Sequence, residues 1–109
     1  MIPSQMLKGT LEGCVLAVIS QHPTYGYEIS SRLADYGFGN IAVGTIYPLL
    51  LRLEKNGSIK AEYAETGSGP QRKYYSLTPQ GEELLASFLQ SFRELALAVQ
   101  TLLEDNNNE

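Results

Sequence analysis

The sequence predicts a mainly helical fold with one small β-hairpin, and three observations support this. Most apolar residues recur at intervals of three and four, as in amphipathic helices. At residues 59–64 the spacing changes to strict alternation, as in a half-buried strand. A second strand-like segment follows at 72–77, and helical spacing then resumes. The chain has 109 residues, 43% of them hydrophobic, which fits one domain with a modest core.

Two helices are expected in the N-terminal part. The first covers residues 4–20, and its apolar run from Cys14 to Ile19 should be buried on more than one side. Pro23 follows the end of this helix. The second helix runs from about residue 24 to 36, with Thr24 as its N-cap.

The third helix ends before Gly57, because glycine commonly terminates helices. Its first residue stays open, since Pro48 breaks a hydrogen bond inside a helix. Local propensity makes Thr45 the cap and Ile46 the first residue. A start near Val43 requires a local distortion at Pro48.

Two strands and a long helix complete the chain. Residues 59–64 and 72–77 would pair as a hairpin through a turn segment at 66–71. Thr78 is the expected N-cap of the last helix, and Pro79 takes its first position. The helix should run to about Leu103, and its apolar stripe is too wide for a monomer to cover. Six stripe positions are expected to form a dimer interface: Leu85, Phe88, Phe92, Leu95, Val99 and Leu102.

The order of elements is helix, helix, helix, strand, strand, long helix, which is the winged-helix arrangement. In that fold the second and third helices form a helix-turn-helix, and the third enters the major groove of DNA. We therefore expect a winged helix-turn-helix domain at residues 4–77 and a C-terminal dimerisation helix at 78–104. A disordered acidic tail is expected at 105–109.

The net charge of −4 argues against a nucleic-acid partner, but the charge is unevenly distributed. Residues 37–76 contain five cations and three anions, which gives +2, whereas the rest of the chain carries −6. Screening limits phosphate attraction to a range of ~8 Å at physiological salt. A weakly basic middle segment can therefore bind double-stranded DNA on an acidic protein.

Several other classes of protein are disfavoured. There is no paired Cys and His, no metal-ligand cluster and no nucleotide-binding loop, so neither an enzyme nor a cofactor is expected. Cys14 is the single cysteine, which excludes an intrachain disulfide and fits a cytoplasmic setting. No signal peptide is visible, and no apolar run approaches the ~20 residues that span a bilayer.

Three stretches stand out: YGYEI at 25–29, GTIYPLLLRLEKNG at 44–57 and GPQRKYYSLTPQG at 69–81. Together they resemble the PadR-like family of transcriptional regulators. They occur in the order and at the spacing of that family. The resemblance implies a homodimeric repressor whose long last helix packs on its partner. It also implies the short subfamily, which has no further C-terminal domain.

Five candidate DNA contacts lie in the third helix and the hairpin. Arg72 and Lys73 follow the turn, where a wing meets phosphate or the minor groove; alternatively, they line a solvated hairpin edge. Thr45 and Tyr47 lie at the front of the third helix, where hydroxyls reach phosphates. Alternatively, Thr45 is only a cap and Tyr47 packs. Arg52 should be exposed and within reach of the DNA backbone.

Two tyrosines at the start of the second helix are further candidates. We expect one of Tyr25 and Tyr27 to pack in the core and the other to contact phosphate, without assigning which. Glu54 in the third helix is expected to pair with a cation rather than to contact a base.

An effector would have to use surfaces already present in so short a chain. The resemblance suggests a small planar aromatic or phenolic compound bound between the last helices and the first. Phe92 from each subunit could sandwich it; alternatively, Phe92 only fills the dimer core. The expected lining residues are Leu11, Val15, Phe88, Leu89 and Phe92.

A winged-helix module that binds proteins and not DNA is the competing hypothesis, and the net charge keeps it open. We expect a DNA-binding protein to bring Arg52, Arg72 and Lys73 onto one face with the front of the third helix.

Overall fold

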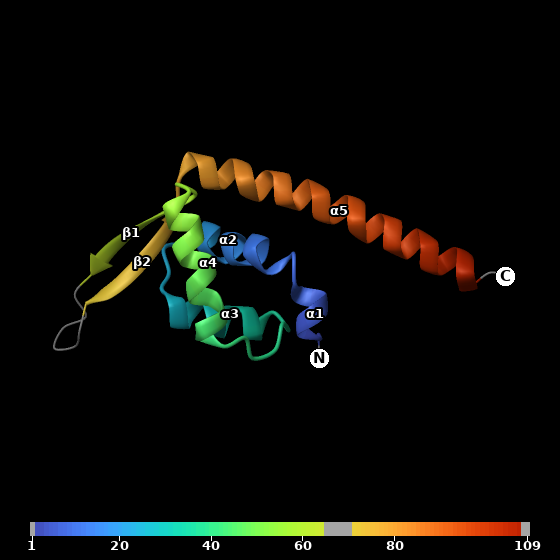
Figure 1. The fold of residues 1–109 in the computed structure, drawn as a ribbon, viewed down its shortest axis with the longest axis horizontal. Helices are drawn as coiled ribbons and strands as arrows, with labels where there is room; N and C mark the ends of the chain where they lie inside the picture. The colour runs from blue at the N-terminus through green and yellow to red at the C-terminus, as the bar shows by residue number, and fades with distance from the viewer. Residues whose placement is uncertain (1, 65–70, 108–109) are drawn as a thin grey trace.

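The computed structural model describes residues 2–64 and 71–107. It is mainly helical with one antiparallel hairpin, as predicted. The core helices α2, α3 and α4 gather at the centre, the hairpin extends to one side, and α5 runs across α2 and continues beyond it (Figure 1). The elements are α1 (Ser4–Leu7), α2 (Leu11–Gln21), α3 (Gly26–Asp35), α4 (Val43–Lys55), β1 (Ile59–Ala64), β2 (Arg72–Leu77) and α5 (Pro79–Asn107).

The prediction of one helix over residues 4–20 was wrong, because the chain breaks between α1 and α2. Gly9 has a φ of 94°, a left-handed conformation that favours glycine. The Thr10 hydroxyl donates to the Leu7 carbonyl at 2.9 Å, and the Thr10 amide donates to the same oxygen at 3.0 Å. These bonds satisfy a carbonyl at the end of α1, so the two short helices can meet at an angle.

Thr24 does not cap α3, contrary to the prediction. Its backbone pairs with Tyr75 on the free edge of β2, with amide-to-carbonyl distances of 3.1 and 2.7 Å. Its hydroxyl donates to Glu28 Oε1 at 2.6 Å. The sheet bridge fixes Thr24 in an extended conformation, so α3 begins two residues later, at Gly26.

α4 begins at Val43, the earlier of the two starts considered, and holds Pro48 in its interior. Pro48 cannot donate to the carbonyl of Gly44, but both residues are exposed, so water can satisfy that oxygen. α4 ends at Lys55, and Gly57 follows with a φ of 83°, which confirms it as the helix stop.

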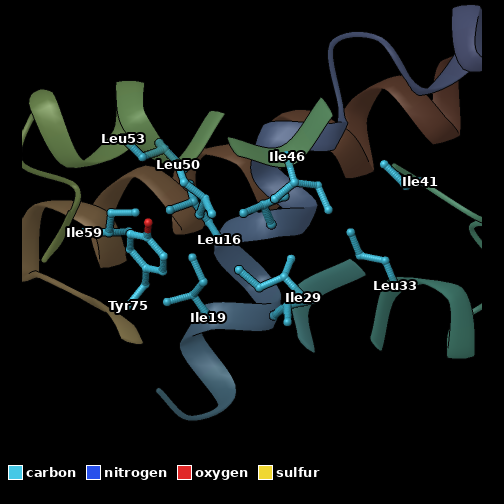
Figure 2. Packing of buried hydrophobic residues seen from close by; sticks show 12 residues of the cluster. Leu16, Ile19, Ile29, Leu33, Ile41, Ile46, Leu50, Leu53, Ile59 and Tyr75 are labelled. Carbon is cyan, nitrogen blue, oxygen red and sulfur yellow. The ribbon is translucent and has the colours of Figure 1, made fainter. Parts of the chain in front are cut away.

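The hairpin has the predicted strand bounds and pairs Ile59 with Leu77 and Ala64 with Arg72. Its turn at residues 66–70 lies outside the described residues. The core lies between α2, α3, α4 and the base of the hairpin (Figure 2). It is formed by Val15, Leu16, Val18, Ile19, Ile29, Leu33, Ile41, Ile46, Leu50, Leu53, Ile59 and Tyr75.

α5 starts as predicted but ends later. The Gly81 amide donates to the Thr78 hydroxyl at 3.1 Å, which confirms Thr78 as the cap before Pro79. The helix continues through Asn107, so the predicted end at residue 104 was wrong, and residues 105–107 are helical. Residues 108 and 109 of the predicted tail lie outside the described part. None of the described helices combines the length and apolarity needed to span a membrane.

Candidate nucleic-acid interface

α4 presents different residues on each of its sides, because successive residues are turned by about 100°. Ile46, Leu50 and Leu53 face the core. Two sides flank the core face: Tyr47 and Glu54 lie toward the hairpin, whereas Thr45, Leu49 and Arg52 lie toward α1. The side opposite the core is exposed, and we call it the outer face of α4; it consists of Gly44, Pro48, Leu51 and Lys55.

Lys73 joins the hairpin to α4. Its ammonium group donates to Glu54 Oε1 at 2.9 Å and lies 5.5 Å from the centre of the Tyr75 ring. The hydrogen bond with Glu54 raises the pKa of Lys73. The prediction that Glu54 pairs with a cation is thus confirmed, and the start of β2 is joined to α4.

Arg72 lies on the other face of the hairpin, since neighbouring strand residues alternate. Its guanidinium carbon is 4.5 Å from the centre of the Tyr25 ring, and Tyr25 meets Tyr74 edge-on at 5.4 Å. Tyr25 is half-buried in this stack, whereas Tyr27 is 68% exposed. The structure therefore packs Tyr25 and leaves Tyr27 accessible at the start of α3.

Tyr47 connects the front of α4 to the start of α3. A Cβ placed on Gly26 would lie 3.1 Å from Cε1, Cζ and the hydroxyl of Tyr47, so the ring packs directly on the glycine backbone. Nearly half of the Tyr47 side chain remains exposed. Thr45 is also exposed, but it faces the α1 side.

Arg52 lies away from the hairpin. Its Nε donates to Glu12 Oε2 of α2 at 3.0 Å. Arg52 and Glu54 are two residues apart and point about 200° apart around α4, so Arg52 and Lys73 lie on opposite sides of it. Arg52, Arg72 and Lys73 therefore do not converge on one face: each cation meets a partner within the chain.

The sequence did not reveal a cleft of about 1010 Å³ between α1, the start of α2, the segment before α4 and α4 itself. It was missed because it opens where the predicted first helix breaks. Its walls include Ile2, Leu7, Leu11, Phe38, Leu49 and Arg52.

Most side chains of α5 from residue 91 to residue 105 are exposed. Of the six predicted dimer positions, Leu85 and Phe88 are half-buried, and a Cβ on Gly13 would overlap the Phe88 ring. The remaining four are exposed: Phe92, Leu95, Val99 and Leu102. Leu97 and Leu103 are further exposed leucines on this helix, outside the predicted set.

The predicted effector site needs one correction. Val15 is fully buried in the core, so its side chain cannot line an open site. Leu11 and Phe88 are half-buried, and Leu89 and Phe92 are exposed, so these four remain accessible. The rings of Phe88 and Phe92 stack with their centres 6.1 Å apart.

A family model described as "Transcriptional regulator PadR-like family" matches residues 15–87, from α2 into α5. The chain belongs to the PadR-like family. Solved PadR-like structures share its fold over nearly the whole chain. A PadR-like regulator from Bacillus cereus ATCC 14579 is 47% identical, covers 91% of this chain and 96% of its own, and gives a TM-score of 0.82. A Streptococcus transcriptional regulator is 46% identical over 92% and 98% of the two chains, with a TM-score of 0.80.

Bacillus subtilis PadR, solved in complex with operator DNA, is also similar. It is 26% identical, with a TM-score of 0.68, over 74% of this chain and 47% of that protein. The family and the solved relatives are transcriptional regulators and not enzymes. This PadR-like chain is accordingly a transcriptional regulator with a winged-helix fold.

Proposed function

We propose that this PadR-like regulator is a homodimeric repressor that binds operator DNA through the outer face of α4 and the hairpin. The observation that carries the proposal is the exposed outer face of α4, with a cation-bearing hairpin beside it. The operator complex of Bacillus subtilis PadR supports the same role, since that protein shares the fold.

The internal partners of the three cations are compatible with DNA binding. Arg52 and Glu12 form an ion pair near the surface, and so do Lys73 and Glu54. The Lys73 and Glu54 side chains each keep about one third of their surface exposed, and Arg52 is more exposed. Ion pairs that solvent still reaches contribute little, roughly 0–1 kcal/mol. A phosphate can therefore replace the carboxylate when DNA approaches, and Arg72 can contact phosphate from its position over Tyr25.

A gel-shift assay against the DNA upstream of its own gene, repeated over a salt series, tests the proposal. The double variant Arg72→Ala, Lys73→Ala should weaken binding to all sequences. It should also reduce the salt slope by about 3.6, or ~0.9 for each of the four phosphate contacts that the dimer loses. Arg93→Ala on α5 is the control for lost positive charge and should leave the slope unchanged. Equal slopes for the wild type and the double variant would remove the hairpin from the interface. Absence of DNA binding by the wild type would favour a protein-binding module.

The homodimer is proposed from α5. Four apolar side chains, Phe92, Leu95, Val99 and Leu102, are exposed along one stripe of this helix. A soluble monomer rarely exposes so continuous a patch, and a second copy with the same stripe can cover it.

Leu95→Glu and Val99→Glu test this arrangement, because a buried, unpaired carboxylate opposes association. Each variant should be monomeric or unfolded by sedimentation and circular dichroism. Gln90→Glu adds the same charge on the opposite face of α5 and should remain a dimer. A well-folded dimer of either stripe variant would refute this interface.

We further propose that a flat, hydrophobic aromatic compound acts as effector between the Phe92 side chains of the two subunits. Phe92 is 45% exposed and already stacks on Phe88, so its free face can take a second ring. Fluorescence titration with planar dyes and phenolic compounds should show binding to the wild type and weaker binding to Phe92→Ala. Leu97→Ala is the control. If no compound binds, or if Phe92→Ala binds as tightly, the site is elsewhere.

A further inference from the structure

The outer face of α4 carries no group that can form hydrogen bonds with purine bases in the turns that would enter the major groove. Within residues 43–54, all of which the structure describes, its members are Gly44, Pro48 and Leu51. Leu51 is 67% exposed. Lys55 is the first charged residue of this face and lies in the last turn of α4.

Major-groove recognition by hydrogen bonds needs particular side chains. Arg and Lys recognise guanine, Asn and Gln recognise adenine, and acidic residues accept from cytosine. None of these stands on the outer face ahead of Lys55. The cation closest to it in sequence, Arg52, is turned toward Glu12 on the α1 side. The base-edge group that matches an aliphatic side chain is the 5-methyl group of thymine.

We propose that Leu51, together with Pro48, recognises thymine methyl groups in the operator. Pro48 lies one turn before Leu51 on the same face, about 4.5 Å along the helix axis. Base pairs are stacked about 3.4 Å apart, so the two side chains can meet neighbouring bases. The proline ring has no side-chain rotamers to lose, which lowers the entropic cost of this contact.

This inference also explains why a leucine is exposed on the outer face of α4, where the core places no demand for an apolar residue. It rests on the proposed function, because it requires α4 to enter the major groove. It specifies that each half-site contains thymine where Leu51 meets the bases.

Deoxyuridine provides the test, since it differs from thymidine only by the missing 5-methyl group. Duplexes that bind the full-length protein are first selected from a random library. The selected duplex is then compared with the same sequence carrying deoxyuridine in place of thymidine. Burying one methyl group changes an affinity by about fourfold. Because a symmetric dimer makes the contact twice, the substituted duplex should bind on the order of tenfold more weakly.

Leu51→Ala separates a direct contact from an effect of DNA shape. The variant should bind the thymidine duplex more weakly than the wild type does. Its preference for thymidine over deoxyuridine should be reduced to the part that Pro48 contributes. A shape effect would persist in the variant at its full size. Leu97→Ala is the matched control, because Leu97 is 66% exposed on α5, and it should retain the full preference for thymidine.

Three outcomes overturn the inference. Equal binding of both duplexes by the wild type would show that no thymine methyl group is read. A preference for thymidine that is undiminished in Leu51→Ala would assign it to another residue or to DNA shape. If the wild type selects no duplex at all, the proposed DNA binding fails, and this inference fails with it.

Discussion

The junction between the hairpin and α5 leaves no room for a side chain at Gly81. Gly81 is buried in the first turn of α5, and a Cβ there would overlap the carbonyl oxygen of Ser58. It would also lie 3.3 Å from Cδ2 of Leu77. The obstacle is backbone and not the flexible end of a side chain. Gly81→Ala must therefore push the start of α5 away from Ser58.

Three hydrogen bonds that close this junction set the expected cost. The Thr78 amide donates to Ser58 O at 3.1 Å, and its hydroxyl donates to Gly57 O at 2.6 Å. In the third, Nε2 of Gln80 donates to the backbone carbonyl of Asn56 at 2.8 Å. At about 1 kcal/mol each, their loss costs about 3 kcal/mol. The higher helix propensity of alanine returns about 1 kcal/mol, so Gly81→Ala should lose about 2 kcal/mol of unfolding free energy.

Thermal unfolding followed by circular dichroism measures this loss. For a chain of this size, 2 kcal/mol corresponds to a decrease in Tm of about 8–16 °C. Protein concentrations must be equal, because the stability of a dimer depends on concentration. Gly44→Ala is the matched control: Gly44 is an exposed helical glycine with nothing within 4 Å of its missing Cβ. That variant should gain up to ~1 kcal/mol. The argument fails if Gly81→Ala is as stable as the wild type.

Three further predictions concern other contacts. Glu54→Gln should raise DNA affinity a few-fold at low salt, because it frees Lys73 and removes a carboxylate from the interface; weaker binding would mean that the ion pair positions the hairpin. The free energy of unfolding should fall above about pH 10, because the pKa of Lys73 is raised by its hydrogen bond with Glu54 and that of Tyr75 by burial. Both groups hold their protons more tightly when folded, so the stabilisation is full below that pH. Glu54→Gln should show a smaller fall in alkaline unfolding curves. Gly13→Ala should cost about 1–3 kcal/mol in urea unfolding, because its Cβ displaces the Phe88 ring; unchanged stability would show that Phe88 moves without cost.

The sequence predicted the elements whose signals are local. Alternation predicted the first strand, and the segment after the turn predicted the second, both with their observed bounds. Thr78 and Gly57 correctly marked a helix start and a helix stop. It also predicted that the last helix carries an apolar stripe, four positions of which the structure leaves exposed. Hydrophobic period and capping residues encode these features within a few positions, so no knowledge of distant contacts is needed.

Local sequence signals gave a wrong prediction in two places, at Thr24 and at Gly9. Thr24 has the side chain of a helix cap, but its backbone pairs with Tyr75, which is about fifty residues away. The break at Gly9 was hidden because apolar spacing continues on both sides of it. A glycine within a helical pattern does not reveal whether its φ is negative or positive.

The partners of the candidate DNA-binding residues were decided only by tertiary structure. Arg52 pairs with Glu12, forty positions away, and Lys73 with Glu54, nineteen positions away. Which of Tyr25 and Tyr27 packs depends on how the start of α3 lies against β2. The sequence by itself determined that these cations and rings exist and which helix or strand holds them. Their mutual geometry depended on packing, because ion pairs and ring stacks act over a few ångströms, and only the folded core brings distant segments that close.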